Sequence, residues 1–184
     1  MRKISILVFV ALLSISNSVF SQITLESVLN ALAGKNYKTV NITTQTVTVN
    51  STSKLGGQSK EVFKFTVPEN TKKISFRATV IPVKSSFQYE ENESFYTLIQ
   101  NRKAKDVYTP QNKKVNFFIF SRSYDADGFL NNNNFKYLFG TYLNSFIHSL
   151  DITPGTYWIG VQNTDSFNGL KVIVEIVASG YFDK

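Results

Sequence analysis

The chain has 184 residues, of which 42% are hydrophobic, 14% aromatic and 18% charged, and its formal net charge is +7. This length and aromatic content indicate a single ordered domain with a sizeable core, and exclude a disordered chain and a multi-span membrane protein. The sequence contains no cysteine and one histidine. Disulfides, thiolate metal sites, thiol nucleophiles and most multi-histidine metal sites are therefore excluded.

The first 21 residues have the three-part pattern of a secretory signal peptide. Residues 1–3 are basic, residues 4–13 are apolar, and residues 19–21 place compact side chains before a cleavage site at Gln22. The apolar run is too short to cross a bilayer core of about 30 Å as a helix. We therefore expect an exported protein, periplasmic or secreted, that does not span a membrane after cleavage. An exported chain without cysteine also fits a bacterial source.

Residues 22–36 are expected to form a short amphipathic helix and a linker. Thr24 is a suitable N-cap and Gly34 a suitable residue beyond the C-terminus of this helix. The apolar residues that share one face at helical spacing are Leu25, Val28, Leu29 and Leu32.

From residue 38 onward the apolar period changes to two, which is typical of strands. In residues 38–50, Ile42 has the opposite parity to Val47 and Val49, so we expect a bulge or break near residues 44–46. Residues 63–67 and 74–80 both alternate, and a short polar turn separates them. This pattern predicts an antiparallel hairpin.

The rest of the chain continues as strands and polar loops. Residues 115–120 form a nearly continuous apolar run, as expected for a central strand buried on both faces, and residues 125–134 are interpreted as a polar loop. Seven or eight short strands with turn signals between them predict an all-β fold, an antiparallel two-sheet jelly-roll-like sandwich over residues 37–184 with one short N-terminal helix. The further strands are expected at residues 95–99, 135–143, 145–150, 157–161 and 172–176.

Two segments resemble the pre-peptidase C-terminal (PPC) domains of bacteria. Residues 62–71 (VFKFTVPENT) resemble the opening hairpin of these domains, and residues 152–161 (ITPGTYWIGV) with 172–175 (VIVE) resemble the closing pair. Residues 115–120 (VNFFIF) are similar to the central strand, with Asn116 where the family usually has an aspartate. The resemblance implies a jelly-roll-like sandwich from a secreted protein. Such domains accompany extracellular hydrolases and are thought to assist secretion, solubility or substrate adhesion.

One segment partly matches a calcium-binding loop. Asp125, Asp127 and Asn131 fall at alternating ligand positions, with Gly128 at the bend, so these three are candidate ligands for calcium. The first position is Ser123 rather than aspartate, and the last lacks the usual bidentate glutamate. The alternative is a loop whose Asp, Gly and Asn residues serve turn geometry. No other cofactor is expected.

The only histidine, His148, is adjacent to Ser149 and lies near Asp151. A catalytic triad requires convergence in space rather than adjacency in sequence, and no G-x-S-x-G elbow is present. We interpret His148 as a residue near a strand end and expect no catalytic centre.

The remaining candidates are aromatic and basic residues. Aromatic rings beside amide and hydroxyl groups suit sugars, and basic side chains attract anionic polymers. The candidate ligand-binding residues are therefore Trp158, Tyr142, Arg102 and Lys103. These features predict a non-catalytic binding or accessory module for carbohydrate or a cell-envelope polymer. The alternative is a structural protein that docks on another envelope protein through an apolar sheet face, and nucleic acid is not an expected partner.

Trp158 has the opposite parity to its neighbours Tyr157 and Ile159, so its side chain is expected on the other face of the sheet. We expect the N-terminal helix to cover the indole. The alternative is an open patch that Trp158 forms beside Ile173.

Overall fold

A computed structural model describes residues 33–83, residue 96 and residues 114–183. The chain divides into two units, Met1–Asn36 with Asp183–Lys184, and Tyr37–Phe182, and the sandwich described here is that of the second unit. The predicted signal peptide, the predicted helix at residues 25–32, and Arg102 and Lys103 lie outside the described residues. In the part of the chain that is described, no helix is long and apolar enough to cross a membrane.

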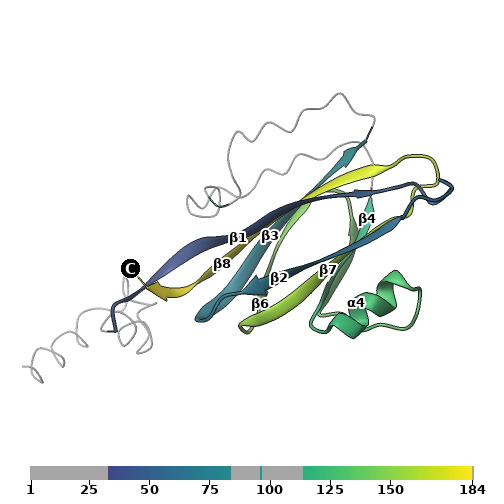
Figure 1. Ribbon diagram of the computed structural model, residues 1–184. Coiled ribbons are helices and arrows are strands. Elements are labelled where there is room, and N and C mark those ends of the chain that lie inside the picture. The colour runs from purple at the N-terminus through teal and green to yellow at the C-terminus, as the bar shows by residue number, and fades with distance from the viewer. Residues whose placement is uncertain (1–32, 84–95, 97–113, 184) are drawn as a thin grey trace, which may run out of the picture. The chain divides into compact units, whose positions relative to one another are not determined.

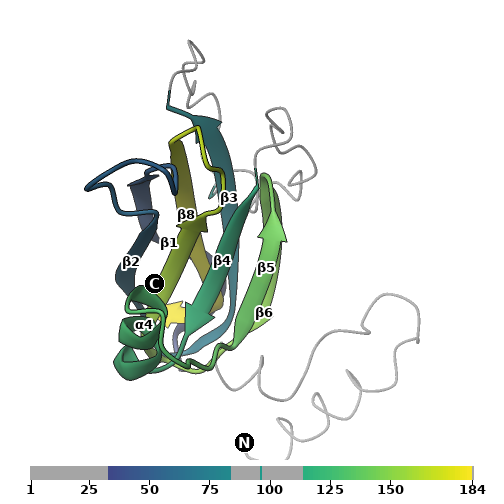
Figure 2. The ribbon, with the colours of Figure 1, turned by 90° about the vertical axis from the view of Figure 1, so that its right-hand side faces the viewer.

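Within the described ranges, eight strands form two four-stranded sheets, and the strand pairs whose register is defined are antiparallel. One sheet has the order β1-β8-β3-β6 and the other β2-β7-β4-β5. The sheets stack face to face as two layers (Figures 1 and 2), which confirms the predicted all-β sandwich. In chain order the strands are β1 (Lys35–Val49), β2 (Lys60–Val67), β3 (Thr71–Pro82), β4 (Val115–Phe120), β5 (Phe139–Leu143), β6 (Phe146–Asp151), β7 (Gly155–Asn163) and β8 (Leu170–Asp183).

The main core lies between the sheets and is built by the alternation seen in the sequence. Phe65 on β2 and Phe76 on β3 are both buried, which confirms the predicted inward parity of these strands. Phe76 stacks on Phe117 with 5.4 Å between ring centroids, so the two sheets meet through aromatic contacts. The fully buried apolar residues of this core include Val49, Ile74, Val80, Ile119, Ile159, Val161, Val172 and Ile176.

The predicted hairpin of residues 63–67 and 74–80 is wrong, because these strands belong to different sheets. Strand β2 pairs with β7, whereas β3 pairs with β6 and β8. The turn between them contains Asn70 at φ 64°, a left-handed conformation that asparagine tolerates. A hairpin and a crossing between sheets both bury one alternating face, so the pattern itself does not distinguish them. Strands β7 and β8 likewise lie in different sheets.

Strand β1 presents residues of both parities to the same core. Val47 and Val49 are buried in the core, and Ile42 packs against it although it lies an odd number of residues away. A regular strand points such residues to opposite faces, so this packing fits a bulge near residues 44–46. Strand β1 is continuous from Lys35 to Val49, and the bulge itself stays a prediction.

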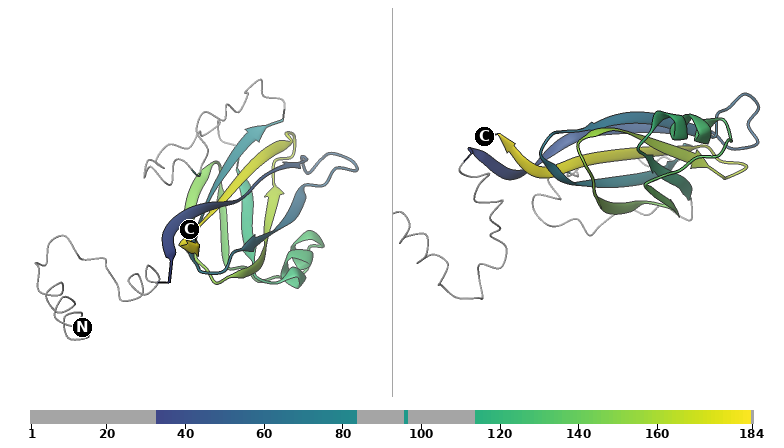
Figure 3. Two further views of the ribbon diagram at one scale, coloured as in Figure 1. Left: turned by 60° about the vertical axis from the view of Figure 1, so that its left-hand side comes forward. Right: turned by 90° about the horizontal axis from the view of Figure 1, so that it is seen from below.

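Three further predictions about local structure differ from the structure. The segment expected to be a polar loop begins with a helix, α4 (Ser123–Leu130), and the strand expected at residues 135–143 is shorter, because β5 begins at Phe139. Tyr96, the one described residue of the strand predicted at 95–99, is helical. Helix α4 lies outside the β2-β7-β4-β5 sheet (Figures 2 and 3), and its buried Ala126 and Phe129 face that sheet.

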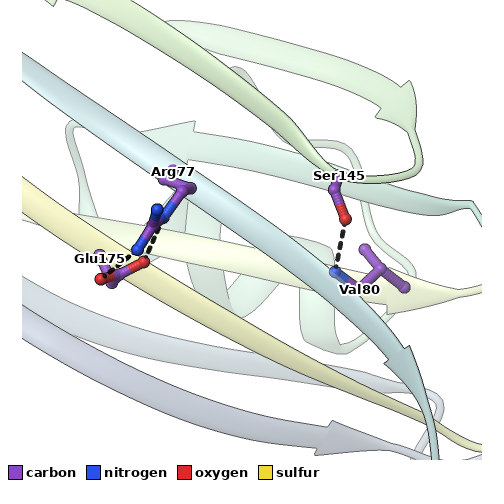
Figure 4. Close-up of polar contacts among 4 residues, drawn as sticks. All are labelled: Arg77, Val80, Ser145 and Glu175. Carbon is purple, nitrogen blue, oxygen red and sulfur yellow. Dashed lines mark hydrogen bonds and ion pairs between the residues drawn. The ribbon is translucent and has the colours of Figure 1, made fainter. Parts of the chain in front are cut away.

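The outer face of the other sheet carries a buried ion pair (Figure 4). Arg77 on β3 lies opposite Glu175 on β8 in the register, and its side chain donates from Nε to Oε2 at 2.5 Å and from Nη2 to Oε1 at 2.8 Å. The two side chains are only 8% and 7% exposed. In the same sheet, the backbone N–H of Val80 donates to the hydroxyl of Ser145 at 3.0 Å. This bond extends the contact between β3 and the segment that enters β6.

Replacement of Phe76 by alanine is expected to lower the free energy of unfolding by about 3–5 kcal/mol, because it empties a fully buried aromatic site. Urea denaturation followed by circular dichroism measures this change. The control is Phe167→Ala, which removes an exposed ring and should change stability by less than about 0.5 kcal/mol. Equal effects of the two substitutions would contradict the assignment of the core.

Replacement of Arg77 by methionine is expected to cost about 3–5 kcal/mol, because the buried Glu175 then loses the two hydrogen bonds that it accepts from the guanidinium group. The double variant Arg77→Met/Glu175→Leu should recover a large part of this loss, since both buried charges are removed together. A double-mutant cycle by chemical denaturation tests the coupling. Strictly additive losses would show that the two charges do not depend on each other.

Candidate functional site

The outer face of the β2-β7-β4-β5 sheet carries a polar row that runs across all four strands. In the register of the sheet, Tyr142 on β5 lies opposite Asn116 on β4, Asn116 opposite Gln162 on β7, and Gln162 opposite Lys60 on β2. Because directly paired residues point to the same face of a sheet, these four side chains form one continuous line. We refer to Tyr142, Asn116, Gln162 and Lys60 as the polar row.

The polar row is held in place by hydrogen bonds at its centre and at its Tyr142 end. The side-chain Nδ2 of Asn116 donates to Oε1 of Gln162 at 2.9 Å, and both residues are half-buried. The hydroxyl of Tyr142 lies 3.2 Å from Oγ1 of Thr164, and Nζ of Lys114 lies 5.6 Å from the centroid of its ring. Tyr142 is nevertheless 50% exposed. A positioned aromatic ring is thus available to solvent beside two amides and an ammonium group.

Lys60, at the other end of the row, is engaged by helix α4. Its ammonium donates to the carbonyl of Phe129 at 2.5 Å and to Oδ1 of Asn132 at 2.6 Å, and it lies 4.7 Å from the Phe129 ring centroid. Burial lowers the pKa of Lys60, since desolvation disfavours its charged form. A cation beside the last carbonyl groups of a helix is favourable. Lys60 therefore joins α4 to the sheet rather than facing a ligand.

Beside the polar row, α4 covers an aromatic cluster on the same outer face. Its buried members are Phe120, Ala126 and Phe129, and Phe118, Phe135 and Trp158 pack against them. Two glycines make room for these rings. A Cβ at Gly160 would lie 2.8 Å from the rings of Phe120 and Phe129, and one at Gly140 would lie 2.8 Å from the ring of Phe118. Helix α4 packs closely on the sheet because Gly160 lacks a side chain, and the absence of one at Gly140 leaves room for Phe118 and Tyr137.

A second exposed tyrosine and a hollow lie next to the cluster. The ring of Tyr137 is 5.2 Å from that of Phe118, and its edge lies above Gly140. Tyr137 also borders an open hollow of about 390 Å³. The other residues that line it are Ser121, Arg122, Asp125, Lys136 and Leu138. Tyr142, Gly140, Tyr137 and this hollow therefore follow one another along the exposed side of β5 and the segment that precedes it.

The base of the hollow is held together by Asp125. This buried carboxylate accepts a hydrogen bond from Nε of Arg122 at 2.7 Å and one from the backbone N–H of Lys136 at 2.8 Å. The hydrogen bond from Arg122 is the main cause that lowers the pKa of Asp125, and the bond from Lys136 lowers it further. In return, the hydrogen bond to Asp125 raises the pKa of Arg122. Asp125 thereby ties the start of α4 to the segment that carries Tyr137.

The structure places the predicted ligand-binding residues in different environments. Tyr142 is exposed on the polar row, whereas Trp158 is half-buried in the aromatic cluster. Among the described residues, Trp158 packs against the cluster that includes Ala126 and Phe129 of α4. The N-terminal helix that we expected to cover the indole lies outside the described residues, so that cover stays a prediction. The alternative patch of Trp158 beside Ile173 is wrong, because these residues lie in different sheets. Ligand contact by Tyr142 or Trp158 stays a prediction.

The candidate calcium ligands lie on α4 and at its end rather than in an extended loop. Asp125 is buried and bonded to Arg122 and Lys136, while Asp127 is exposed. Asn131 donates from its side-chain Nδ2 to the backbone carbonyl of Asp127 at 2.9 Å. Among the described residues, no group of three or more acidic, His or Cys side chains is arranged to hold a metal ion. Calcium binding by these residues stays a prediction.

The side chains of His148 and Ser149 point to opposite faces of β6. The His148 ring stacks on Phe139 with 4.2 Å between centroids, whereas the hydroxyl of Ser149 lies 2.7 Å from that of Ser75 on the outer face. Asp151 is exposed and lies 3.9 Å from Nζ of Lys73. These three residues therefore do not converge as a triad would.

Asn116, Gln162 and Thr164 were not predicted from the sequence as parts of one site. The sequence contains one sign of their position, namely the alternation of inward and outward residues. Asn116 alternates with the buried Val115 and Phe117, and Gln162 has the same outward parity as Trp158. Their proximity depends on the pairing of β4 with β7, which joins strands 46 residues apart in the chain. Alternation predicts the face of a residue but not its neighbour across the sheet.

Comparison with solved structures yields a likeness of fold. No protein-family model matches the chain, and none of the curated proteins matches it. Among solved structures, the chain is similar to the pre-peptidase C-terminal domain of a collagenase from Bacillus anthracis, with 13% identity, coverage of 72% of this chain and 88% of that chain, and a TM-score of 0.40. That domain is of the family that residues 62–71 and 152–161 resemble.

Replacement of Asp125 by asparagine is expected to destabilise the protein at neutral pH and much less in acid. Because the pKa of Asp125 is lowered on folding, its stabilising contribution is complete above the unfolded value of about 3.9 and is lost as the pH falls toward the folded value. Urea denaturation at neutral pH and at a series of pH values below about 4 measures the difference from the parent chain. Asp127→Asn, which changes an exposed carboxylate on the same helix, is the control. A pH-independent difference would contradict the assigned role.

Proposed function

We propose that this protein is an exported, non-catalytic module that binds a saccharide-containing polymer of the cell envelope or its surroundings. The observation that carries the proposal is the exposed ring of Tyr142 beside the Asn116–Gln162 amide pair. A planar ring packs against the apolar face of a sugar, and amides bond sugar hydroxyl groups in the plane beside it. The signal-peptide pattern of residues 1–21 supports export to the periplasm or the medium.

Three features support a polymer rather than a small molecule. Tyr142 and Tyr137 lie along the same side of the sheet on either side of Gly140, so successive sugar units have two rings to contact. The hollow beyond Tyr137 is open rather than enclosed. Lys114 beside Tyr142 and Lys136 at the hollow add positive charge, which favours acidic sugars or phosphate-bearing polymers.

The amide pair supplies the polar part of this surface. The bond between Asn116 and Gln162 uses one donor and one acceptor. The side-chain oxygen of Asn116 can still accept, the amino group of Gln162 can still donate, and each of the two bonded atoms keeps one further position for a hydrogen bond. Vicinal hydroxyl groups of a sugar, each of which donates and accepts, match this combination.

The alternative function, docking through an apolar sheet face, has less support. On the outer face of the β1-β8-β3-β6 sheet, Ile81, Ile173 and Val177 are buried, and on the other sheet α4 covers the aromatic cluster. The apolar side chains that this alternative requires are therefore not exposed on the described sheet faces.

Replacement of Tyr142 by alanine is expected to weaken binding to a recognised polysaccharide about tenfold, because about 1.4 kcal/mol of ring contact is lost. Affinity electrophoresis against a panel of neutral and acidic polysaccharides identifies the ligand, and titration calorimetry compares the variants. Tyr142→Phe retains the ring but loses the contact with Thr164, so it should retain most of the affinity.

The control variant is Tyr37→Ala, which removes an exposed tyrosine from the other sheet. Its affinity should equal that of the parent chain. Absence of binding to every polysaccharide, or equal weakening by Tyr37→Ala and Tyr142→Ala, would contradict the proposal.

A further inference from the structure

Two neighbouring loops expose single large apolar side chains almost completely. Leu55, between β1 and β2, is 99% exposed, and Phe167, between β7 and β8, is 89% exposed. Both loops lie at the same end of the sandwich, because β2 and β7 are antiparallel and Lys60 pairs with Gln162 there (Figures 1 and 3). Val83, which follows β3 at this end, is also half-exposed, and its N–H donates to Gly169 in the second loop at 3.0 Å.

The two loops are joined to each other. The backbone N–H of Thr52 donates to the carbonyl of Asp165 at 3.0 Å, and its hydroxyl donates to that of Ser166 at 3.5 Å. A link of this kind fixes the loop that carries Leu55 against the loop that carries Phe167. The two apolar side chains are therefore presented together rather than independently.

A buried asparagine supports both loops from below. Asn163 is fully buried, and its Nδ2 donates to the carbonyls of Asn50 at 3.1 Å and Asn168 at 2.7 Å. Its Oδ1 accepts from the N–H of Asp165 at 2.9 Å. The Asp165 carboxylate in turn accepts from the N–H groups of Phe167 at 2.8 Å and Asn168 at 2.9 Å. This network fixes the backbone of Phe167 while its ring stays in solvent.

Among the described residues, two exposed lysines flank the loops. Lys54 lies next to Leu55 and is exposed, and Lys171 is exposed at the start of β8. The acidic group within the loops, Asp165, has its Oδ1 atom bonded to backbone N–H groups. At the surface of a bilayer, anionic head groups lie above the hydrocarbon layer. Exposed lysines can contact the head groups there while neighbouring apolar side chains enter the hydrocarbon.

We propose that this end of the sandwich is a membrane-contact surface, at which Leu55 and Phe167 insert into the interfacial layer of a bilayer that contains anionic lipids. Two side chains on projecting loops offer a surface area far below the roughly 800 Å² that each partner buries in a stable protein interface. A bilayer needs no complementary shape, and it gains from each apolar side chain that leaves water. Lys54 and Lys171 lie where they contact lipid phosphate groups.

The insertion is tested with tryptophan reporters in the full chain. Phe167→Trp is expected to show a blue shift and quenching by brominated lipids when vesicles of phosphatidylcholine and phosphatidylglycerol are added, and the signal of the parent chain, which contains only Trp158, is subtracted. Tyr124→Trp, at an exposed position on α4, is the control and should show neither effect. Equal responses of the two reporters, or none from Phe167→Trp, would overturn the proposal.

A second measurement compares vesicle sedimentation of the parent chain with that of Leu55→Ser/Phe167→Ser. The double variant should partition at least about tenfold more weakly, since both apolar anchors are lost. Its Trp158 emission and circular dichroism should match those of the parent chain, because both residues are exposed. Undiminished partitioning of a folded double variant would show that another part of the chain makes the contact, and would also overturn the proposal.

Discussion

The arrangement of the candidate site depends on the absence of side chains at Gly160 and Gly140. A Cβ at Gly160 would lie 2.8 Å from ring atoms of Phe120 and Phe129, and one at Gly140 would lie 2.8 Å from Phe118. A side chain at Gly160 would therefore prevent α4 from packing on the sheet, and one at Gly140 would displace the rings of Phe118 and Tyr137. The packing of α4 in turn fixes Lys60 and Asp125. The position of Tyr137 beside the hollow follows from these contacts.

Alternation in the sequence predicted which residues are buried but not which strands are neighbours. Phe65 and Phe76 were assigned correctly to the core, yet β2 and β3 cross between sheets instead of forming a hairpin. The period of two records only that one face of each strand is apolar. In a sandwich both sheets face the same core, so the strands on either side of a turn show the same pattern in both arrangements.

Helix α4 illustrates a different limit of sequence reasoning. Its sequence contains Asp125, Asp127 and Gly128, residue types that are poor helix formers and common in turns. The helix is stabilised instead by long-range contacts, namely Ala126 and Phe129 against the sheet and Lys60 at its last carbonyls. Local propensity is a weak predictor when tertiary packing decides the outcome. The polar row was missed for a related reason, because Asn116 and Gln162 meet only through the pairing of distant strands.

Asn163 connects the two surfaces that the proposals assign to this end of the sandwich. It is fully buried at the end of β7, and a buried amide must have its donors and acceptors satisfied. Its side chain meets this requirement by binding the backbone on both sides, at Asn50 and at Asn168. The segment that follows it carries Thr164, which contacts Tyr142, and Phe167, which projects into solvent. One buried side chain thus sets the position of the polar contact on the sheet and of the apolar loop beyond it. The segment after Asn163 would therefore fix the distance and the orientation between a polymer bound beside Tyr142 and a lipid surface at the loops.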